Sequence, residues 1–398
     1  MRDRLEQHLR KLAVEIGPRP IGSAANHAAA AYLRGVFQAA GLDVGDQRIG
    51  CPEWVHHDTQ LHVGGAALAA AANPFSPACD VTAPLVAAGT LAELQAAELE
   101  GRIVVLHGDL SKEPLIPGQC TLYNAERDLA INRRLIDGRP AAVVAVNLQP
   151  GSLNRLIEDW NLPVPSVTVP AETGRIVLDN LGRPARLTID ARTAPGYSTN
   201  IVGRQAGRSS TQLVVCAHYD TKIETPGALD NGGGVAVLLT LAQQLATLDL
   251  NLGLEWVAFT GEEYFNGEPD AAYIAEKGGE LEKVLAAINL DGIGYRLGVN
   301  TITLMAQSAA LQAQVEAVVA RYPAIQWVEP WPQSNHSTFA WRGVPSFALS
   351  SIGAFGLAHL PVDTVEWVSL DKLREAASVV MDLVLSVQDR SAGWARAQ

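Results

Sequence analysis

The sequence lacks the features of several protein classes. It contains only four cysteines in 398 residues, and no two of them form a Cys-x-x-Cys pair. It has no low-complexity tract and no repeat with the period of a solenoid. Its most apolar run, between Gly64 and Ala72, is far too short to cross a bilayer. These absences argue against a disulfide framework, a repeat array and a membrane-spanning protein.

Basic character and a secretion signal are also missing. The formal net charge is -12, so neither nucleic acid nor an anionic membrane is an expected partner. The first residues, from Met1 to His8, lack the apolar core of a signal peptide. We therefore expect free thiols and a reducing, cytoplasmic location. Nothing in the sequence indicates the oligomeric state.

What is present is the composition of a globular protein with more than one core. Hydrophobic residues make up 48% and charged residues 18% of the chain, and 398 residues favour two domains. Between residues 44 and 195, glycine, proline and short apolar runs dominate, with strand candidates at 102–107 and 141–146. We predict that 44–195 is an inserted α/β or β-rich domain, and that 1–43 and 196–398 form the catalytic domain.

The chain after Tyr197 alternates between apolar strands and helices. This alternation predicts an α/β fold with a mixed, largely parallel sheet flanked by helices. Ligands of such sheets gather beyond the carboxyl ends of the strands. The predicted strands are 213–217, 254–259, 284–290, 301–305 and 346–349, and the predicted helices are 233–248, 308–322 and 369–387.

His218 and Asp220 follow the strand 213–217. Because they are two residues apart, their side chains share one face. His218 could bind a metal through one ring nitrogen while Asp220 orients it from behind. By itself, the pair fits a solvated strand end equally well.

Three carboxylates stand at similar positions. Asp230 precedes a glycine run and a helix, so it could bridge two cations or simply cap that helix. Glu262 and Glu263 follow the strand 254–259. Two adjacent carboxylates point in different directions, so one could bind metal while the other takes a proton from water. A pair of surface glutamates explains them as well.

Asp291 and the last histidines complete the set of candidates. Asp291 ends the apolar run 284–290, where a charged group needs a partner or water. His359 lies after a glycine-rich loop and is followed by Asp363. His336 could contact substrate, support a metal site, or be an ordinary loop residue. None of these positions decides the function alone.

Taken in order, the motifs resemble the co-catalytic dizinc exopeptidase family. That family includes bacterial leucyl aminopeptidases, aminopeptidase Y and glutamate carboxypeptidase, with glutaminyl cyclase and the transferrin receptor ectodomain as relatives. The segment Arg19-Pro20-Ile21-Gly22-Ser23 is similar to the family's opening, and 44–195 resembles a protease-associated domain. The motifs that carry the resemblance are His-x-Asp (218–220), Asp-Asn-Gly-x-Gly (230–234), Gly-Glu-Glu (261–263), Asn-Leu-Asp-x-x-Gly (289–294) and His-x-x-x-Asp-Thr (359–364).

The resemblance implies a peptidase with two zinc ions per chain, acting on peptides. Metal-activated water would attack the scissile carbonyl, and release of N-terminal residues is the favoured activity. The implied roles are His218 and Asp291 on one zinc, Glu263 and His359 on the other, Asp230 as the bridge, Glu262 as the general base, Asp220 behind His218, and Asp363 as a support for the His359 loop.

Departures from the family pattern leave alternatives open. Asn335 replaces an aspartate of the family, and the segment 264–270 differs from the usual wall beside the base. A glutaminyl cyclase would hold one zinc, a carboxypeptidase would use arginines such as Arg296 and Arg342, and a binding protein would hold no metal. An apolar wall could be formed by Trp327, Trp331, Trp341 and Phe355, although we expect at least half of these to be core.

Overall fold

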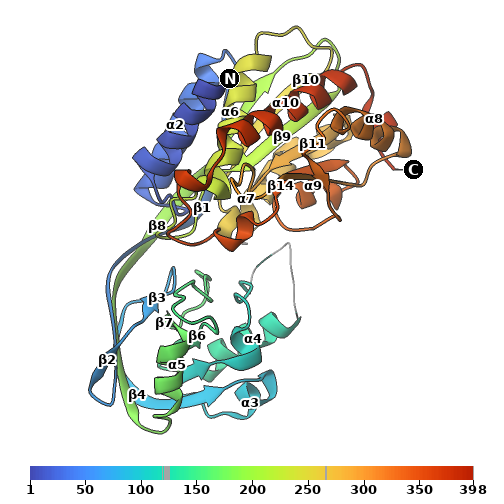
Figure 1. The fold of residues 1–398 in the computed structure, drawn as a ribbon. Coiled ribbons are helices and arrows are strands. Elements are labelled where there is room, and N and C mark those ends of the chain that lie inside the picture. The colour runs from blue at the N-terminus through green and yellow to red at the C-terminus, as the bar shows by residue number, and fades with distance from the viewer. Residues whose placement is uncertain (119, 121–125, 265–266, 398) are drawn as a thin grey trace. The chain divides into compact units, whose positions relative to one another are not determined.

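The computed structural model describes residues 1–118, 120, 126–264 and 267–397 (Figure 1). The chain forms two compact units. The first contains Met1–Gly50, Tyr197–Glu263 and Gly267–Gln398. The second contains Cys51–Gly196 and a short segment that begins at Tyr264. The second unit begins after residue 44 because strand β1 (Asp43–Val63) starts within the first unit.

A mixed sheet forms the middle of the first unit. Its central strands run parallel in the order β14 (Ser346–Ser351), β11 (Val284–Leu290), β9 (Gln212–His218) and β10 (Gly253–Phe259). Strand β12 (Asn300–Met305) pairs antiparallel with β14, and β8 (Pro184–Gln205) pairs antiparallel with β10. The predicted fold class, a largely parallel sheet flanked by helices, is confirmed. The short strand β13 (Gln326–Trp327) extends this sheet beyond β12.

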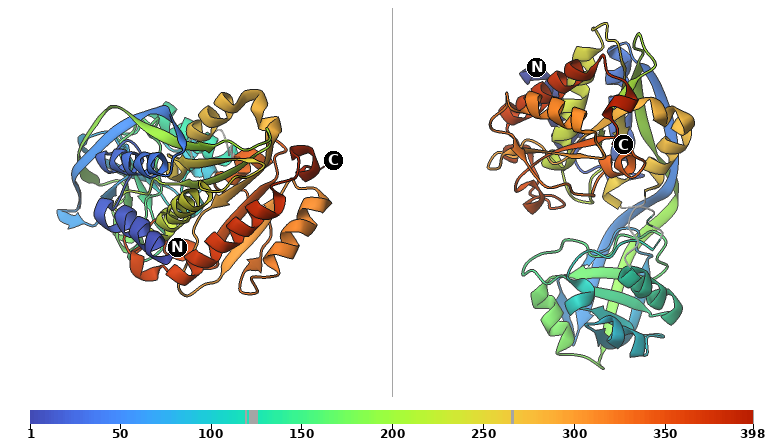
Figure 2. Two further views of the ribbon diagram at one scale, coloured as in Figure 1. Left: turned by 90° about the horizontal axis from the view of Figure 1, so that it is seen from above. Right: turned by 90° about the vertical axis from the view of Figure 1, so that its right-hand side faces the viewer.

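Helices cover both faces of this sheet, because successive side chains of a strand point to opposite sides. One core lies on the first face of the sheet. It contains Leu213, Val215 and Ala217 of β9 together with the helices that cover this face (Figures 1 and 2). Val214 and Cys216 face a second core, which includes Tyr273 and Phe339. The first layer contains α1 (Arg2–Arg10), α2 (Ala24–Ala39), α6 (Gly233–Leu245), α8 (Ala309–Val319) and α10 (Leu370–Val387), and the second contains α7 (Glu268–Lys277) and α9 (His336–Ala340).

The start of α6 is fixed by a close approach to β11. A Cβ atom at Gly234 would lie only 2.4 Å from the carbonyl oxygen of Leu290. Glycine is therefore required there for the helix to begin next to the end of the strand. This approach places Asp230, just before the helix, beside Asp291, just after the strand.

The second unit has two cores, and its strands continue the sheet path through β8. Strands β4 to β7 are parallel, and the first half of β8 pairs antiparallel with β4. Helix α5 (Ala171–Leu178) packs on one core, and α3 (Leu91–Ala96) and α4 (Glu126–Gly138) pack on the other. The strands predicted at 102–107 and 141–146 are β5 and β6. Between these strands the sequence also predicts a helix from Asn124 to Asp137, and its start lies outside the described residues.

Further short elements complete both units. The remaining strands are β2 (Ala66–Leu68), β3 (Ala71–Ala72), β4 (Cys79–Ala88), β5 (Ile103–Leu106), β6 (Ala142–Val146) and β7 (Ser166–Val169). The remaining helical turns are η1 (Lys11–Ile16), η2 (Gly108–Ser111), η3 (Ala228–Gly232), η4 (Glu262–Tyr264), η5 (Gly278–Lys283), η6 (Ala354–Gly356), η7 (Val365–Trp367) and α11 (Ala392–Ala395). Among the helices that the structure describes, none has the length and apolar character needed to span a bilayer.

Candidate metal centre

The candidate residues meet at the carboxyl edge of the parallel strands. His218 is the last residue of β9 and pairs in register with Phe259, the last residue of β10. Asp291 follows β11 directly. Parallel neighbours end at the same edge of a sheet, so residues far apart in the sequence come together here.

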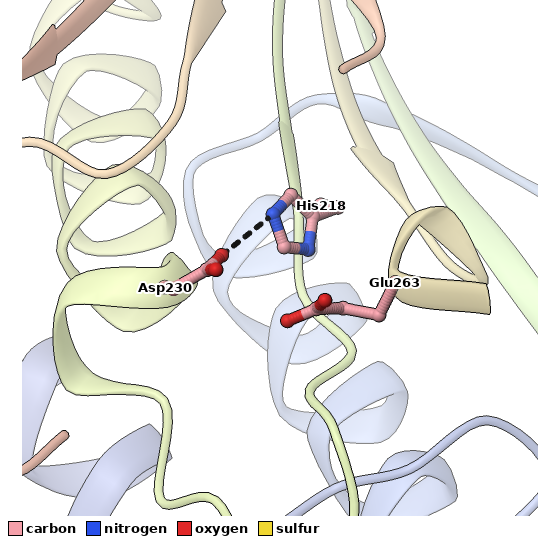
Figure 3. Close-up of side chains that lie close together, drawn as sticks. All are labelled: His218, Asp230 and Glu263. Carbon is pink, nitrogen blue, oxygen red and sulfur yellow. Dashed lines mark ion pairs between the residues drawn. The ribbon is translucent and has the colours of Figure 1, made fainter. Parts of the chain in front are cut away.

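Asp230 lies between two histidines. Its Oδ1 atom is 3.1 Å from Nε2 of His218, and its Oδ2 atom is 3.2 Å from Nε2 of His359. Figure 3 shows Asp230, His218 and Glu263 converging from η3, β9 and η4. Each oxygen of one carboxylate therefore faces a different imidazole, which is the arrangement that a bridging ligand requires.

Two donor groups share this carboxylate. In the first, Nε2 of His218 is 3.3 Å from Oδ1 of Asp291. In the second, Nε2 of His359 is 3.0 Å from Oε2 of Glu263. Two donors that each lie roughly 2.0–2.1 Å from a tetrahedral zinc ion are about 3.3 Å apart, so both groups fit zinc. The structure thus brings all five predicted ligands together, while their roles stay predictions.

The charge of the cluster points to an external cation. Burial acts to lower the pKa of His218, but the carboxylates of Asp291 and Glu262 outweigh it and raise that pKa well above its usual value. The pKa of His359 is raised in the same way, mainly by Glu263, against the effect of burial. The Oε1 atom of Glu263 is buried without a hydrogen-bond partner. The imidazoles thus sit in an excess of carboxylate, which protons or metal ions can neutralise.

The two adjacent glutamates differ in exposure. The side chain of Glu262 is 16% exposed, whereas that of Glu263 is 2% exposed and contacts His359. Burial raises the pKa of the Glu262 carboxyl well above its usual range. A partly exposed carboxylate with a raised pKa suits a general base, and an enclosed one suits a ligand.

Asp220 positions the glutamates. Its Oδ1 atom is 3.6 Å from Nδ1 of His218, which is too long for a hydrogen bond. Its two oxygens instead accept the backbone N–H groups of Glu262, at 3.3 Å, and Glu263, at 3.2 Å. Besides its predicted place behind His218, Asp220 therefore has a second role: it holds the turn that carries Glu262.

Asp363 connects the His359 loop to the Asp230 loop. Its carboxylate accepts the N–H groups of Leu229, at 2.7 Å, and Asp230, at 3.0 Å. Burial raises the pKa of Asp363 to about 7. Its side chain therefore binds the segment that carries the bridging carboxylate, a partner that the sequence does not indicate.

The departure at Asn335 has a structural counterpart. The side-chain amide of Asn335 donates to both carboxylate oxygens of Asp270, at 3.0 and 3.2 Å, and Thr338 donates to the same group. Burial raises the pKa of Asp270 to about 6. Sequence reasoning missed Asp270, since only its position after Pro269 at a helix start marks it.

His336 does not join the donor groups. It is buried, its Nε2 atom is 2.7 Å from the carbonyl oxygen of Trp331, and burial lowers its pKa. The side-chain amide of Asn289 is 3.5 Å from its Nδ1 atom. Of the three roles considered for His336, these contacts favour support of the loop that precedes α9.

The expectation that at least half of the four aromatic residues are core is wrong. Phe355 is 55% exposed, Trp341 48% and Trp327 41%, and Trp331 is partly exposed. The rings of Trp331 and Phe355 contact each other edge to face. Trp327 lies in the terminal strand β13, Trp341 directly after α9 and Phe355 in η6, so apolar character alone does not bury these residues. Phe265 and Asn266, in the predicted wall beside the base, lie outside the described residues.

A comparison with known families agrees with this geometry. A model described as peptidase family M28 matches residues 200–384. That range contains all five predicted ligands together with Glu262. Residues 200–384 therefore form a region of the peptidase family M28 type. The match begins within β8 and ends within α10, so the M28 region lies almost wholly in the first unit.

Curated relatives of this chain are distant. Aminopeptidase YwaD of Bacillus subtilis (strain 168) is 25% identical over 393 residues, covering 93% of this chain and 81% of the relative. Leucine aminopeptidase 2 of Trichophyton rubrum is 25% identical over 325 residues, covering 74% of this chain. The chain spans only 61% of the length of that second relative.

Solved structures share the fold of almost the whole chain. The zinc aminopeptidase BSAP from Bacillus subtilis matches with a TM-score of 0.80 at 22% identity, covering 100% of this chain and 98% of that chain. The aminopeptidase from Aneurinibacillus sp. strain AM-1 matches with a TM-score of 0.77 at 21% identity, covering 100% and 95%.

Proposed function

We propose that this chain is a zinc-dependent aminopeptidase that releases N-terminal residues from peptides. The observation that carries the proposal is the Asp230 carboxylate, whose two oxygens face His218 and His359 separately. The M28 match and the names of the relatives, which are aminopeptidases, support the same activity.

We assign each residue of the donor set a role in the proposed reaction. His218 and Asp291 would hold one zinc ion, His359 and Glu263 the other, and Asp230 both. Bound zinc lowers the pKa of water and polarises the scissile carbonyl. Glu262 takes the proton from the attacking water and delivers it to the leaving amine. Asp220 holds the backbone amide of Glu262, and this fixes the base relative to the ligands.

The charge of the site favours the N-terminal end of a peptide. A free α-amino group is a cation, and the carboxylates around the donor groups are in excess over the two histidines. The arginines considered for a carboxypeptidase are bonded to backbone: Arg296 donates to the carbonyl of Val368 and Arg342 to that of Thr338. We therefore expect the substrate's amino end, rather than its carboxylate, near the metals.

The nature of the second unit and the location of the protein are also proposals. We propose that the second unit is a protease-associated-like domain, supported by its separate cores and its run of parallel strands. We also propose a cytoplasmic location, supported by the thiols of Cys79 and Cys216, which donate to Leu187 and Asn289. Thiols of this kind suit a reducing compartment.

The test is a set of matched substrates. Amino-acid arylamides and dipeptides, each with a free or an N-acetylated amino end, are assayed with and without a chelator. We expect turnover of the free substrates, much slower turnover of the acetylated ones, and loss of activity with chelator that zinc restores. Equal rates on free and blocked substrates, release of C-terminal residues, or cyclisation of N-terminal glutamine without hydrolysis would contradict the proposal.

A further inference from the structure

Arg19 belongs to a motif that the chemistry above leaves unused. Its side chain is fully buried, and the hydrogen bonds of its guanidinium group go to none of the five predicted ligands. Its guanidinium group donates five hydrogen bonds, and every acceptor is a backbone carbonyl. The acceptors are Tyr219 (2.6 Å from Nε), Pro226, Gly17 and Leu12 (2.8, 3.2 and 3.3 Å from Nη1) and Gly227 (3.0 Å from Nη2).

Three of these carbonyls belong to the loops that carry ligands. Tyr219 lies between His218 and Asp220, so its carbonyl is part of the strand end that presents the first histidine. Pro226 and Gly227 begin the turn that leads to Asp230. One side chain is therefore bonded to both loops whose spacing sets the distance between His218 and the bridging carboxylate.

The backbone of Arg19 adds to the same connection. Its N–H group donates to Oγ1 of Thr221 at 2.9 Å, and its carbonyl accepts the N–H group of Thr221 at 3.4 Å. The turn beyond it is tight: Gly227 has φ +59°, and a Cβ atom there would lie 2.4 Å from the carbonyl oxygen of Asp230. Such a turn keeps its shape only while its carbonyls stay bonded.

Arginine can donate hydrogen bonds to carbonyls in several segments at once. A guanidinium group offers five N–H donors in one rigid plane, whereas lysine offers three donors from a single mobile nitrogen. Because the acceptors of Arg19 lie in three separate segments, a single nitrogen cannot reach all of them. The position therefore requires the planar set of donors of a guanidinium group as well as a positive charge.

We infer that Arg19 is a positioning residue that sets the spacing of the His218 and Asp230 loops, and thereby the zinc affinity of the site. The inference rests on the proposed metal centre. Zinc binding can be measured without any substrate, by competition between the folded protein and a coloured chelator. Loss of an outer contact that orients ligands typically lowers metal affinity roughly 10–100-fold.

Two substitutions separate geometry from charge. Arg19→Lys keeps the positive charge but loses the planar set of N–H donors, whereas Arg19→Gln loses both. The matched control is Arg396→Lys, because Arg396 also donates to backbone carbonyls, those of Gly343, Leu281 and Val284, and none of these adjoins a ligand. We expect both Arg19 variants to bind zinc roughly 10–100-fold more weakly. The control should keep wild-type zinc affinity even if its melting temperature falls equally.

Wild-type zinc affinity in Arg19→Lys would overturn the inference and leave the proposed function intact. Absence of zinc binding by the wild-type chain would overturn both. If neither Arg19 variant folds, Thr221→Ala replaces them, because it removes the hydroxyl that accepts the Arg19 amide. Weaker zinc binding by folded Thr221→Ala would then support the inference, and unchanged binding would overturn it.

Discussion

Two buried groups of charged side chains lie at opposite ends of strand β10. Near its start, Glu255 accepts from Nε of Arg204 at 3.0 Å, from the hydroxyl of Tyr273 at 3.1 Å, and from Lys277. Past its end lies the ligand cluster, in which carboxylates surround His218 and His359. The first group is paired with cations of the chain itself, whereas in the second the carboxylates outnumber the two histidines even with Arg19 and Lys222 nearby.

The difference separates a structural cluster from a functional one. A buried carboxylate is tolerated when charged partners and hydrogen bonds surround it, as they surround Glu255. In the ligand cluster, Glu263 keeps a buried oxygen without a partner, and the pKa values of both histidines are displaced upward. Such a site is incomplete without external cations, and titratable groups of this kind are concentrated at functional sites.

The largest effect is expected from removal of the shared ligand. Asp230→Ala should lose most of both zinc ions and with them all measurable activity, because each oxygen serves one donor group. His218→Ala should mainly weaken one ion. Metal analysis of the purified proteins by mass spectrometry measures this difference. Full metal content in Asp230→Ala would disprove the bridging role.

The next effect concerns the base and leaves the metals in place. Glu262→Gln keeps the shape of the side chain but cannot accept a proton. Turnover should fall roughly 10²–10⁴-fold, the range for loss of a general base, with zinc content unchanged. Steady-state kinetics on a free amino-acid arylamide test it. If activity stays within a few-fold of the wild type, another group takes the proton.

A substitution at Glu255, in the group that is paired with Arg204 and Lys277, should lower stability and leave zinc binding unchanged. Glu255→Gln leaves Lys277 and Arg204 without their buried partner and should lower the free energy of unfolding by about 3–5 kcal/mol. Zinc content and zinc affinity should not change. Urea unfolding together with metal analysis separates the two quantities. The exposed pair of Lys283 and Glu280 is the control, since Lys283→Met should cost less than about 1 kcal/mol.

The smallest effect is expected at Asp270, where stability should depend on pH. Its pKa of about 6 exceeds the usual value of 3.8, so its protonated carboxyl stabilises the fold fully below pH 3.8. That contribution, about 3 kcal/mol, is lost as the pH rises through 6. Asp270→Asn removes this titration. The melting temperature of the wild type relative to the variant should therefore fall between pH 4 and pH 7, and a constant difference would contradict the raised pKa.

The positions of His218, Glu263 and Asp291 could be predicted because each ends or follows a continuous apolar run. The runs that end at His218, Phe259 and Leu290 are buried along their whole length, and parallel pairing brings their ends to one edge. Short sequence patterns therefore carry enough information to place these ligands together. Asp230 and His359 follow no such run, and the assignment of all five residues as ligands depended on the family resemblance.

Long-range pairing is what the sequence does not show. Strands β1 and β8 each exceed twenty residues but contain glycine and proline, which in the sequence indicate irregular loops. The hydrogen bonds from Asn335 to Asp270 join helices 65 residues apart in the sequence, and nothing local marks either partner. Arg19 is similar, since its acceptors become neighbours only after the sheet has formed.

The unequal enclosure of the two histidines affects how fast ions exchange. The side chain of His218 is 0% exposed, whereas that of His359 is 30% exposed and its backbone has φ +64°. A chelator therefore reaches the ion held by His359 and Glu263 first. We expect zinc to leave in two phases, a fast one and a slow one, with a singly loaded protein between them. A single phase in stopped-flow chelation would show that both ions leave together.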